Sequence, residues 1–341
     1  MKSVQITRRT FLYSAALLPA IYPTLIKAIP AHAQDVVSHP LMISEMRRQT
    51  YPGSDFVIEQ VLPTAGSYTR SIASYLSEGL KIFTYLTVPR GKKPTTGWPV
   101  VIFNHGFIPP DTYRTTERYI AYQDAFARNG YIVVRSDYRG HDKSEGDSAG
   151  GYGTPAYTVD VLNALGSVRR FADADAARIG MWGHSMGGHI TLRSMVVNKE
   201  IRAGVIWAGV VASYADLLNN WRRRPNAPTP SNEDIPTPGR RWRQDFLEKY
   251  GPPEQNPAFW NAISPISYVS DIAGPIQIHH GTSDTSVPIA FSESLATQFK
   301  TANKPYEYFV YQGDDHNLKR NLGLALRRSV AFFDKHVKSI Q

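Results

Sequence analysis

The sequence predicts an α/β fold in which a mainly parallel sheet of about eight strands is covered on both faces by helices. Continuous apolar runs, typical of buried parallel strands, alternate with helical segments along most of the chain. Two segments near the start, joined by a Ser-Glu-Gly turn, predict an antiparallel edge. A hydrophobic content of 42% with 20% charged residues is typical of a globular protein with a sizeable core.

The expected elements follow one another in a regular order. The antiparallel edge comes first, the buried runs beginning at Trp98 and Tyr131 follow, and helices then separate the later strands. Besides the two buried runs, the expected strands are 56–62, 69–76, 80–88, 177–183, 203–209, 275–281 and 305–311. The expected helices are 114–129, 155–172, 186–198, 288–301 and 318–337.

Residues 211–263 interrupt this alternation. The stretch carries five prolines between Pro225 and Pro238, three tryptophans and two basic clusters, Arg222–Arg224 and Arg240–Arg243. A proline-rich segment of this length between two strand–helix units predicts a helical insertion, or cap. We therefore expect one catalytic domain, 34–341, that contains this insertion.

Charge and cysteine content narrow the classes of function. The formal charge is +9, but residues 1–33 carry four basic residues and no acid, which leaves 9 − 4 = +5 for the rest. This excess favours a solvated surface, with an anionic substrate or a membrane surface as the alternative. No motif of a nucleic-acid-binding module is present, so we expect no nucleic-acid partner. The absence of cysteine excludes thiol catalysis, disulfides and Cys-type metal sites.

The first 33 residues have the layout of an export signal. A basic pair is followed by a short apolar region, interrupted by prolines and Lys27, and by Ala31-His32-Ala33 at the end. The segment Thr7–Leu12 resembles a twin-arginine signal. The resemblance implies transport by the twin-arginine export machinery to the periplasm or the exterior of a bacterium, with no stable membrane span. The alternative is an amphipathic N-terminal helix of the mature fold.

The stretch Gly183-His184-Ser185-Met186-Gly187 joins a predicted strand to a predicted helix. A Gly-x-Ser-x-Gly sequence in that context predicts a nucleophile elbow, a turn so sharp that side chains at the two glycine positions would collide with neighbours. The serine hydroxyl then lies at the carboxyl edge of the sheet, beside a helix N-terminus. Ser185 is therefore the expected nucleophile.

A serine hydroxyl needs a base to take its proton, and the base needs an acid to orient it. In this topology the acid and then the histidine follow the serine along the chain. Asp284 follows the strand 275–281, and His316 follows the last strand. Asp314 and Asp315 compete with Asp284 for the role of acid, although we expect them to cap or solvate the start of the final helix.

An oxyanion formed on attack needs two aligned N–H donors. The backbone amide directly after the nucleophile, that of Met186, is the first expected donor. The second is expected in the loop after the run beginning at Trp98, where Gly106 permits a backbone path that turns an N–H inward. We expect this donor to be the amide of Phe107.

These motifs together resemble the prolyl-oligopeptidase-like catalytic domain and the related dienelactone-hydrolase-type esterases of the α/β-hydrolase superfamily. The motifs that carry the resemblance are Asn104-His105-Gly106-Phe107, Asp137-Tyr138-Arg139-Gly140, the serine elbow, His280-Gly281-Thr282-Ser283-Asp284 and His316. The resemblance implies a serine hydrolase that forms an acyl-enzyme and needs no cofactor. The peptidases usually have His-Gly-Gly-Pro where this sequence has His-Gly-Phe-Ile, and 34–97 is too short for their β-propeller.

Three functions stay open from the sequence. We favour hydrolysis of small-molecule carboxylic esters, because an ester has the better leaving group and no acidic clamp for a peptide amino terminus is recognisable. The first alternative is a serine peptidase acting on short peptides, and the second is a non-catalytic α/β-hydrolase that binds a ligand. We expect no metal site at the four histidines of the elbow and of the strand before Asp284, namely His184, His189, His279 and His280. We also expect Asp137 and Arg139 to form an ion pair.

Overall fold

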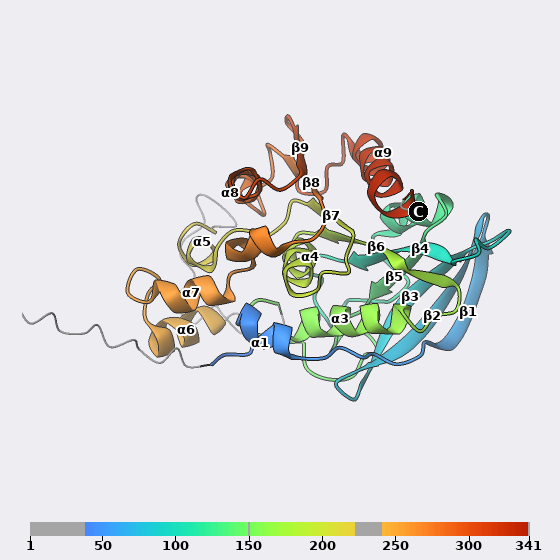
Figure 1. The fold of residues 1–341 in the computed structure, drawn as a ribbon, viewed down its shortest axis with the longest axis horizontal. Helices are drawn as coiled ribbons and strands as arrows, with labels where there is room; N and C mark the ends of the chain where they lie inside the picture. The colour runs from blue at the N-terminus through green and yellow to red at the C-terminus, as the bar shows by residue number, and fades with distance from the viewer. Residues whose placement is uncertain (1–37, 149–150, 222–240, 340–341) are drawn as a thin grey trace, which may run out of the picture. The chain divides into compact units, whose positions relative to one another are not determined.

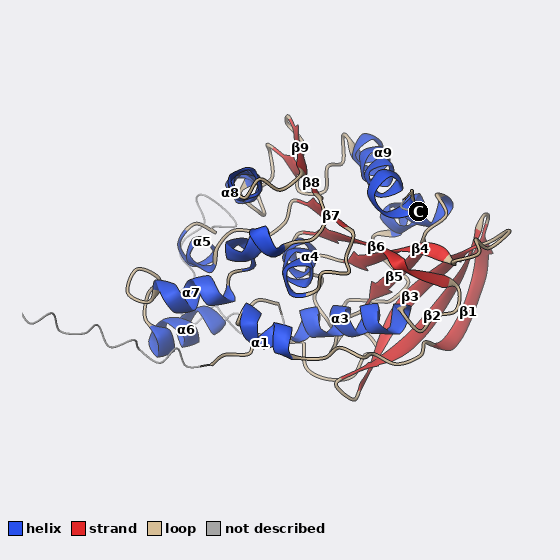
Figure 2. Ribbon diagram, in the orientation of Figure 1, coloured by secondary structure: helices blue, strands red, loops and turns tan. Residues whose placement is uncertain are grey.

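The computed structural model describes residues 38–148, 151–221 and 241–339. In these ranges the chain forms one sheet with helices on both faces (Figure 1, Figure 2). The expected export signal and the cluster Arg222–Arg224 lie outside the described residues. None of the helices in the described ranges is long and apolar enough to cross a membrane.

The described strands form a single sheet of nine, where the sequence predicted about eight. Their order is β1-β2-β3-β5-β4-β6-β7-β8-β9. The first three junctions, from β1 to β5, are antiparallel, and every later one is parallel. The predicted fold class is therefore confirmed. The strands are β1 (Val57–Ala65), β2 (Tyr68–Ser77), β3 (Leu80–Pro89), β4 (Trp98–Asn104), β5 (Ile132–Ser136), β6 (Ala174–His184), β7 (Ala203–Trp207), β8 (Ile276–Gly281) and β9 (Tyr306–Tyr311).

Two apolar layers enclose the sheet. One contains side chains of α1, α3, α4, α7 and α8, and the other contains side chains of α2 and α9. Such double coverage explains why β5 and β7 are buried along their whole length and consist largely of apolar residues. The helices are α1 (Ile43–Arg48), α2 (Ile120–Arg128), α3 (Ala156–Val168), α4 (Met186–Val197), α5 (Tyr214–Asn219), α6 (Trp242–Tyr250), α7 (Pro257–Ile263), α8 (Ile289–Thr301) and α9 (Leu322–Phe333).

The strand order reverses at β4, which lies between β5 and β6. In open α/β sheets the crevice outside the carboxyl ends of the strands at such a switch point is the usual ligand site. β4 ends at Asn104 and β6 ends at His184, so the loops that carry Phe107 and Ser185 both start from this edge. The topology thus brings together two segments about 80 residues apart in the sequence.

The insertion 211–263 is helical where it is described, as α5, α6 and α7. Buried Arg193 of α4 connects it to the rest of the domain, because its Nη2 donates hydrogen bonds to the Tyr214 hydroxyl at 3.0 Å and to the Ile263 carbonyl at 2.7 Å. Its Nη1 donates to the Leu41 carbonyl at 2.8 Å. Both ends of the insertion are therefore attached to α4, while its action as a cap stays a prediction.

The helix expected over 114–129 begins later than predicted, at Ile120. Arg118 and Tyr119 have φ angles of 56° and 52°, in the left-handed region that interrupts a right-handed helix. The carbonyl of Arg118 accepts a hydrogen bond of 2.7 Å from Nη1 of buried Arg135, and Nη2 of the same side chain donates to the Thr115 carbonyl. A long-range contact therefore holds this loop open against the local helical preference.

The expected ion pair between Asp137 and Arg139 is wrong. Arg139 instead pairs with buried Asp160 at 2.7 Å and with Glu78 at 2.9 Å. The Asp137 carboxyl is fully buried and accepts hydrogen bonds from the hydroxyls of Tyr113, at 2.8 Å, and Thr115, at 2.5 Å. The side chains part because the intervening Tyr138 has a φ of 63°, which turns the backbone between them.

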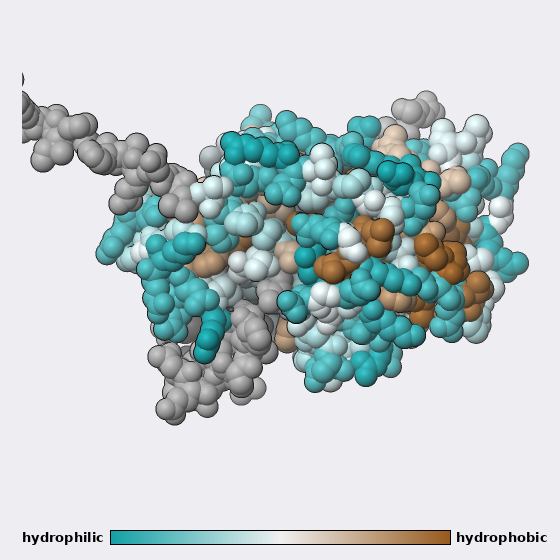
Figure 3. Space-filling view, turned by 90° about the horizontal axis from the view of Figure 1, so that it is seen from below, coloured by the Kyte–Doolittle hydropathy of each residue, from teal (hydrophilic) through white to brown (hydrophobic). Residues whose placement is uncertain are grey.

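Apolar side chains are exposed at one edge of the sheet. The space-filling view shows them gathered on the side of the molecule where β1 lies in Figure 1 (Figure 3). Val57, Ile58 and Val61 of β1 are 57%, 48% and 76% exposed. Four strands separate β1 from β6, so this apolar edge is distinct from the crevice at the switch point.

Candidate active site

Ser185 lies on a strained turn between β6 and α4. Its φ of 56° and ψ of −118° are unusual for a residue with a side chain, and such strain is concentrated at functional sites. A Cβ at Gly183 would lie 2.2 Å from the Gly187 carbonyl oxygen, and a Cβ at Gly187 would lie 2.0 Å from the Asn104 carbonyl oxygen. Both positions of the motif therefore need glycine for steric reasons, as the sequence predicts for an elbow.

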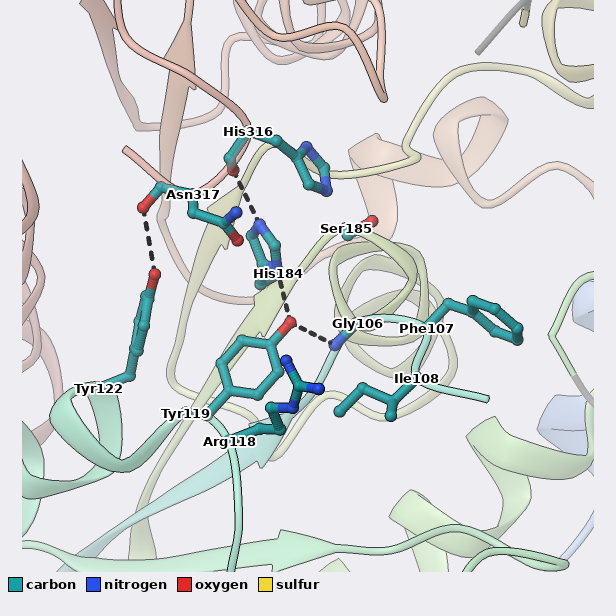
Figure 4. A pocket seen from close by; sticks show the side chains of 10 residues that line it. All are labelled: Gly106, Phe107, Ile108, Arg118, Tyr119, Tyr122, His184, Ser185, His316 and Asn317. Atoms are coloured by element: carbon teal, nitrogen blue, oxygen red, sulfur yellow. Dashed lines mark hydrogen bonds between the residues drawn. The ribbon is translucent and has the colours of Figure 1, made fainter. Parts of the chain in front are cut away.

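A pocket of about 260 Å³ opens at this turn (Figure 4). Ser185 and His316 both line it, although 130 residues separate them in the sequence. The lining residues are Gly106, Phe107, Ile108, Arg118, Tyr119, Tyr122, His184, Ser185, His316 and Asn317.

The structure places Asp284 directly behind His316. The Nδ1 atom of His316 lies 2.7 Å from Oδ2 of Asp284, whose side chain is inaccessible to solvent. Oδ1 of the same carboxyl accepts hydrogen bonds from the amides of Ser286, at 2.7 Å, and Val287, at 3.0 Å. The three predicted residues Ser185, Asp284 and His316 are therefore brought to one site.

The two rival acids lie elsewhere. Asp314 accepts hydrogen bonds from the amides of Arg320, at 3.1 Å, and Asn321, at 3.0 Å, just before α9. Asp315 pairs with Lys319 at 3.1 Å. Both carboxyls are thus engaged by the segment that leads into α9, and neither contacts the His316 ring.

The Asp284 carboxyl has a second histidine partner that sequence reasoning did not assign to the site. Nε2 of His280 lies 3.0 Å from Oδ2 of Asp284 and 3.1 Å from the Val287 carbonyl oxygen. Because both of these oxygens only accept, Nε2 carries the proton, and Nδ1 accepts from the Ser292 hydroxyl at 2.7 Å. The placement of His280 at the end of a strand, four residues before Asp284, was the available signal.

These contacts set the charge of Asp284. Burial by itself would raise the pKa of the carboxyl, but hydrogen bonds from His280, His316 and the Val287 amide outweigh it. The pKa of Asp284 therefore lies well below its ordinary value. The carboxyl stays ionised and can orient His316 and support an imidazolium at that position.

His184 and Tyr119 connect the two loops that flank Ser185 (Figure 4). Nε2 of His184 lies 2.9 Å from the His316 carbonyl oxygen, which only accepts, so Nε2 carries the proton. Nδ1 then accepts from the Tyr119 hydroxyl at 2.7 Å, and the Tyr119 oxygen accepts from the Gly106 amide at 3.0 Å. Burial and the neighbouring His316 lower the pKa of His184 to about 3, so the ring is neutral as this chain of hydrogen bonds requires.

This chain of hydrogen bonds is a feature that the sequence did not predict. His184 occupies the variable position of the elbow motif, and Tyr119 belongs to a segment for which we expected a helix. A Cβ at Gly106 would lie 2.7 Å from the Tyr119 hydroxyl oxygen, so the close approach needs glycine. The glycine after His105 was the only local signal for such a contact.

The two expected oxyanion donors are the amides that directly follow Ser185 and Gly106, those of Met186 and Phe107. The Met186 amide opens α4 and therefore has no acceptor within that helix. Phe107 lines the pocket with a side chain that is 54% exposed. Neither amide donates a hydrogen bond to another residue in the part of the chain that the structure describes, so both N–H groups are open to a bound oxygen.

The other two histidines for which we expected no metal site, His189 and His279, form hydrogen bonds within the fold. Nδ1 of His189 bonds to the Val210 carbonyl at 3.1 Å, and Nδ1 of His279 bonds to the Tyr311 hydroxyl at 2.8 Å. Within residues 38–148, 151–221 and 241–339, no group of three or more His, Asp or Glu side chains is placed to hold a metal ion.

Comparison with known proteins agrees with the sequence resemblance. The model of the prolyl oligopeptidase family matches residues 118–339. An uncharacterized peptidase of Bacillus subtilis, YuxL, is 25% identical over 305 residues, which are 85% of this chain and 41% of that protein. The chain thus spans about two fifths of the length of this relative.

Solved structures of both peptidases and esterases share the fold. The acylaminoacyl peptidase of Pyrococcus horikoshii superposes with a TM-score of 0.63 at 20% identity, over 81% of this chain and 43% of its own. The acetyl xylan esterase of Paenibacillus sp. R4 also has a TM-score of 0.63, at 16% identity, over 86% of this chain and 92% of its own. At these identities the likeness establishes the fold.

Proposed function

The chain belongs to the prolyl oligopeptidase family, and on that premise we propose that it is a serine hydrolase with Ser185, His316 and Asp284 as its catalytic triad. The observation that carries the proposal is the hydrogen bond of 2.7 Å between His316 and ionised Asp284, beside the pocket that His316 shares with Ser185. The strained turn at Ser185 gives independent support.

The proposed reaction has two steps. Ser185 Oγ attacks the acyl carbonyl carbon while His316 Nε2 takes its proton, because Nδ1 is held by Asp284. The amides of Met186 and Phe107 stabilise the oxyanion, and the imidazolium then protonates the departing alcohol or amine. Water attacks the acyl-enzyme in the same way, releases the acid and returns the proton to Ser185.

Carboxylic esters are the substrates that the pocket favours. Among the described lining residues there is no acid to pair with a peptide amino terminus, and an alkoxide leaves more easily than an amine. Hydrolysis of short peptides is the second candidate, supported by the family match and by the description of the Bacillus subtilis relative as a peptidase.

We further propose that the protein is exported by the twin-arginine machinery to the periplasm or the exterior of a bacterium. The pair Arg8-Arg9 before an apolar stretch supports this proposal. Changing both residues to lysine is expected to keep the protein in the cytoplasm, which fractionation of expressing cells would detect. Export of the double variant would contradict it.

The decisive experiment compares 4-nitrophenyl acetate with alanine and Gly-Pro 4-nitroanilides, using the wild-type chain and Ser185→Ala. We expect ester turnover in the wild type, its loss in Ser185→Ala, and labelling of Ser185 by a fluorophosphonate probe. The exposed serine variant Ser270→Ala is the matched control and should behave as wild type. Comparable anilide turnover would favour the peptidase, and activity in Ser185→Ala would refute the triad.

A further inference from the structure

We propose that Arg118 selects substrates that carry a carboxylate close to the scissile ester bond. This inference rests on the proposed function and names the substrate class of the same pocket. Arg118 lines the pocket together with Ser185 and His316, and Figure 4 shows its guanidinium near Tyr119 and Ile108.

Arg118 is the permanently charged member of the described lining residues. The others are apolar or polar groups without a fixed charge, or histidines. The guanidinium is exposed and forms no ion pair or hydrogen bond with any residue in the described ranges. An arginine that faces an active-site pocket without an acidic partner leaves five N–H donors for a ligand.

Three carboxyls of the neighbouring loops are engaged by other residues. Asp315 pairs with Lys319, and Asp142 accepts a hydrogen bond from the Thr115 amide at 3.1 Å. Asp314 is held by backbone amides that precede α9. No described carboxyl, including that of the adjacent Glu117, forms an ion pair with the Arg118 guanidinium, and the positive charge is available to a substrate.

The backbone holds Arg118 at this place. Its φ of 56° and the 52° of Tyr119 are unfavourable in a residue with a side chain, so the surrounding contacts must maintain them. The Arg135 guanidinium donates a hydrogen bond to the Arg118 carbonyl, and the Tyr119 hydroxyl is hydrogen-bonded to both the Gly106 amide and His184. The loop is therefore built from buried contacts, and the Arg118 side chain projects from a fixed point.

A carboxylate is the ligand that best matches this group. A guanidinium binds a carboxylate through two parallel N–H···O bonds, which fixes orientation as well as charge. The same charge repels the ammonium at a peptide amino terminus. A pocket of about 260 Å³ admits a small ester, so the carboxylate lies on a short acyl chain or a small alcohol.

The test uses two pairs of esters that differ in one charge. Mono-4-nitrophenyl adipate is compared with its methyl ester, and 4-acetoxybenzoate with methyl 4-acetoxybenzoate. We expect the wild type to prefer the anionic member of at least one pair by about tenfold in kcat/KM, through a lower KM. Adipate should also inhibit hydrolysis of the neutral ester competitively.

Variants assign the preference to the side chain. Arg118→Gln removes the charge and keeps a polar side chain, so it should abolish the preference, measured as the ratio of kcat/KM for the two esters of a pair, and the adipate inhibition. Arg118→Lys should retain part of the preference. Arg114→Gln changes an exposed arginine of the same loop that does not line the pocket, and should behave as wild type.

Equal rates within both pairs, or a preference that survives in Arg118→Gln, would overturn the inference and leave the serine hydrolase intact. Ester hydrolysis that persists in Ser185→Ala would instead overturn the proposed function.

Discussion

Replacing Tyr119 with phenylalanine tests whether the hydrogen bonds between Gly106, Tyr119, His184 and His316 support the reaction. The substitution removes one oxygen atom, which accepts from the Gly106 amide at 3.0 Å and donates to His184 at 2.7 Å. Tyr119→Phe therefore leaves two buried polar groups without a partner and changes little else in shape.

The structure sets the size of the effect. An unsatisfied buried donor or acceptor costs about 1 to 3 kcal/mol. Gly106 is buried and His184 is 2% exposed, but water from the pocket can reach the vacated position. We therefore expect a loss of about 2 to 4 kcal/mol in the free energy of unfolding. Because Gly106 precedes the proposed oxyanion donor Phe107, kcat should fall about ten- to a hundredfold, with a smaller change in KM.

The assay pairs urea unfolding with ester kinetics, and Tyr122→Phe is the matched control. Tyr122 also lines the pocket, but its hydroxyl makes a single hydrogen bond of 3.1 Å to the Asn317 carbonyl, so about 1 kcal/mol is expected. Equal losses of stability and kcat in the two variants would refute the reasoning, because the Tyr119 hydroxyl would then have no special role.

Three further predictions concern the elbow, the acid and a buried carboxyl. Gly187→Ala places a Cβ 2.0 Å from the Asn104 carbonyl oxygen and should lower the thermal midpoint or prevent folding, whereas Gly323→Ala in α9 should be neutral or slightly stabilising by the same measurement. Asp284→Asn should lower kcat for 4-nitrophenyl acetate by about a thousandfold or more, and an undiminished kcat would exclude it as the triad acid. Burial raises the pKa of Asp137 to about 7, so its stabilising contribution is complete below the unfolded pKa of 3.8 and is lost as the pH rises through 7. In urea unfolding, the free energy of unfolding of Asp137→Asn should therefore rise relative to that of the wild type by about 1.4 kcal/mol per pH unit from pH 5 to 6 and by less as the pH approaches 7, and a constant difference would contradict this assignment.

Local patterns in the sequence were enough to predict most of the fold. The strands from β4 to β8 are covered on both faces, and most of them contain continuous apolar runs. Such a run can be recognised in the sequence without knowing which segments pack against it. The turn at Ser185 was also predictable, because the Gly-x-Ser-x-Gly motif between a strand and a helix is itself a local pattern, although the atom that excludes a side chain at Gly187 belongs to distant Asn104. The chain order of Ser185, Asp284 and His316 followed from the strands that precede them.

Contacts between distant segments were decided by the tertiary structure alone. The start of α2 was misplaced because buried Arg135, on β5, holds Arg118 in a left-handed conformation that no local propensity favours. His280 behind Asp284 and the pairing of Tyr119 with His184 likewise depend on loops that meet only after the sheet has formed. Sequence therefore determined which chemical groups end each strand, and the packed fold determined which of those groups face one another, because hydrogen-bond partners far apart in the chain leave no periodic signal.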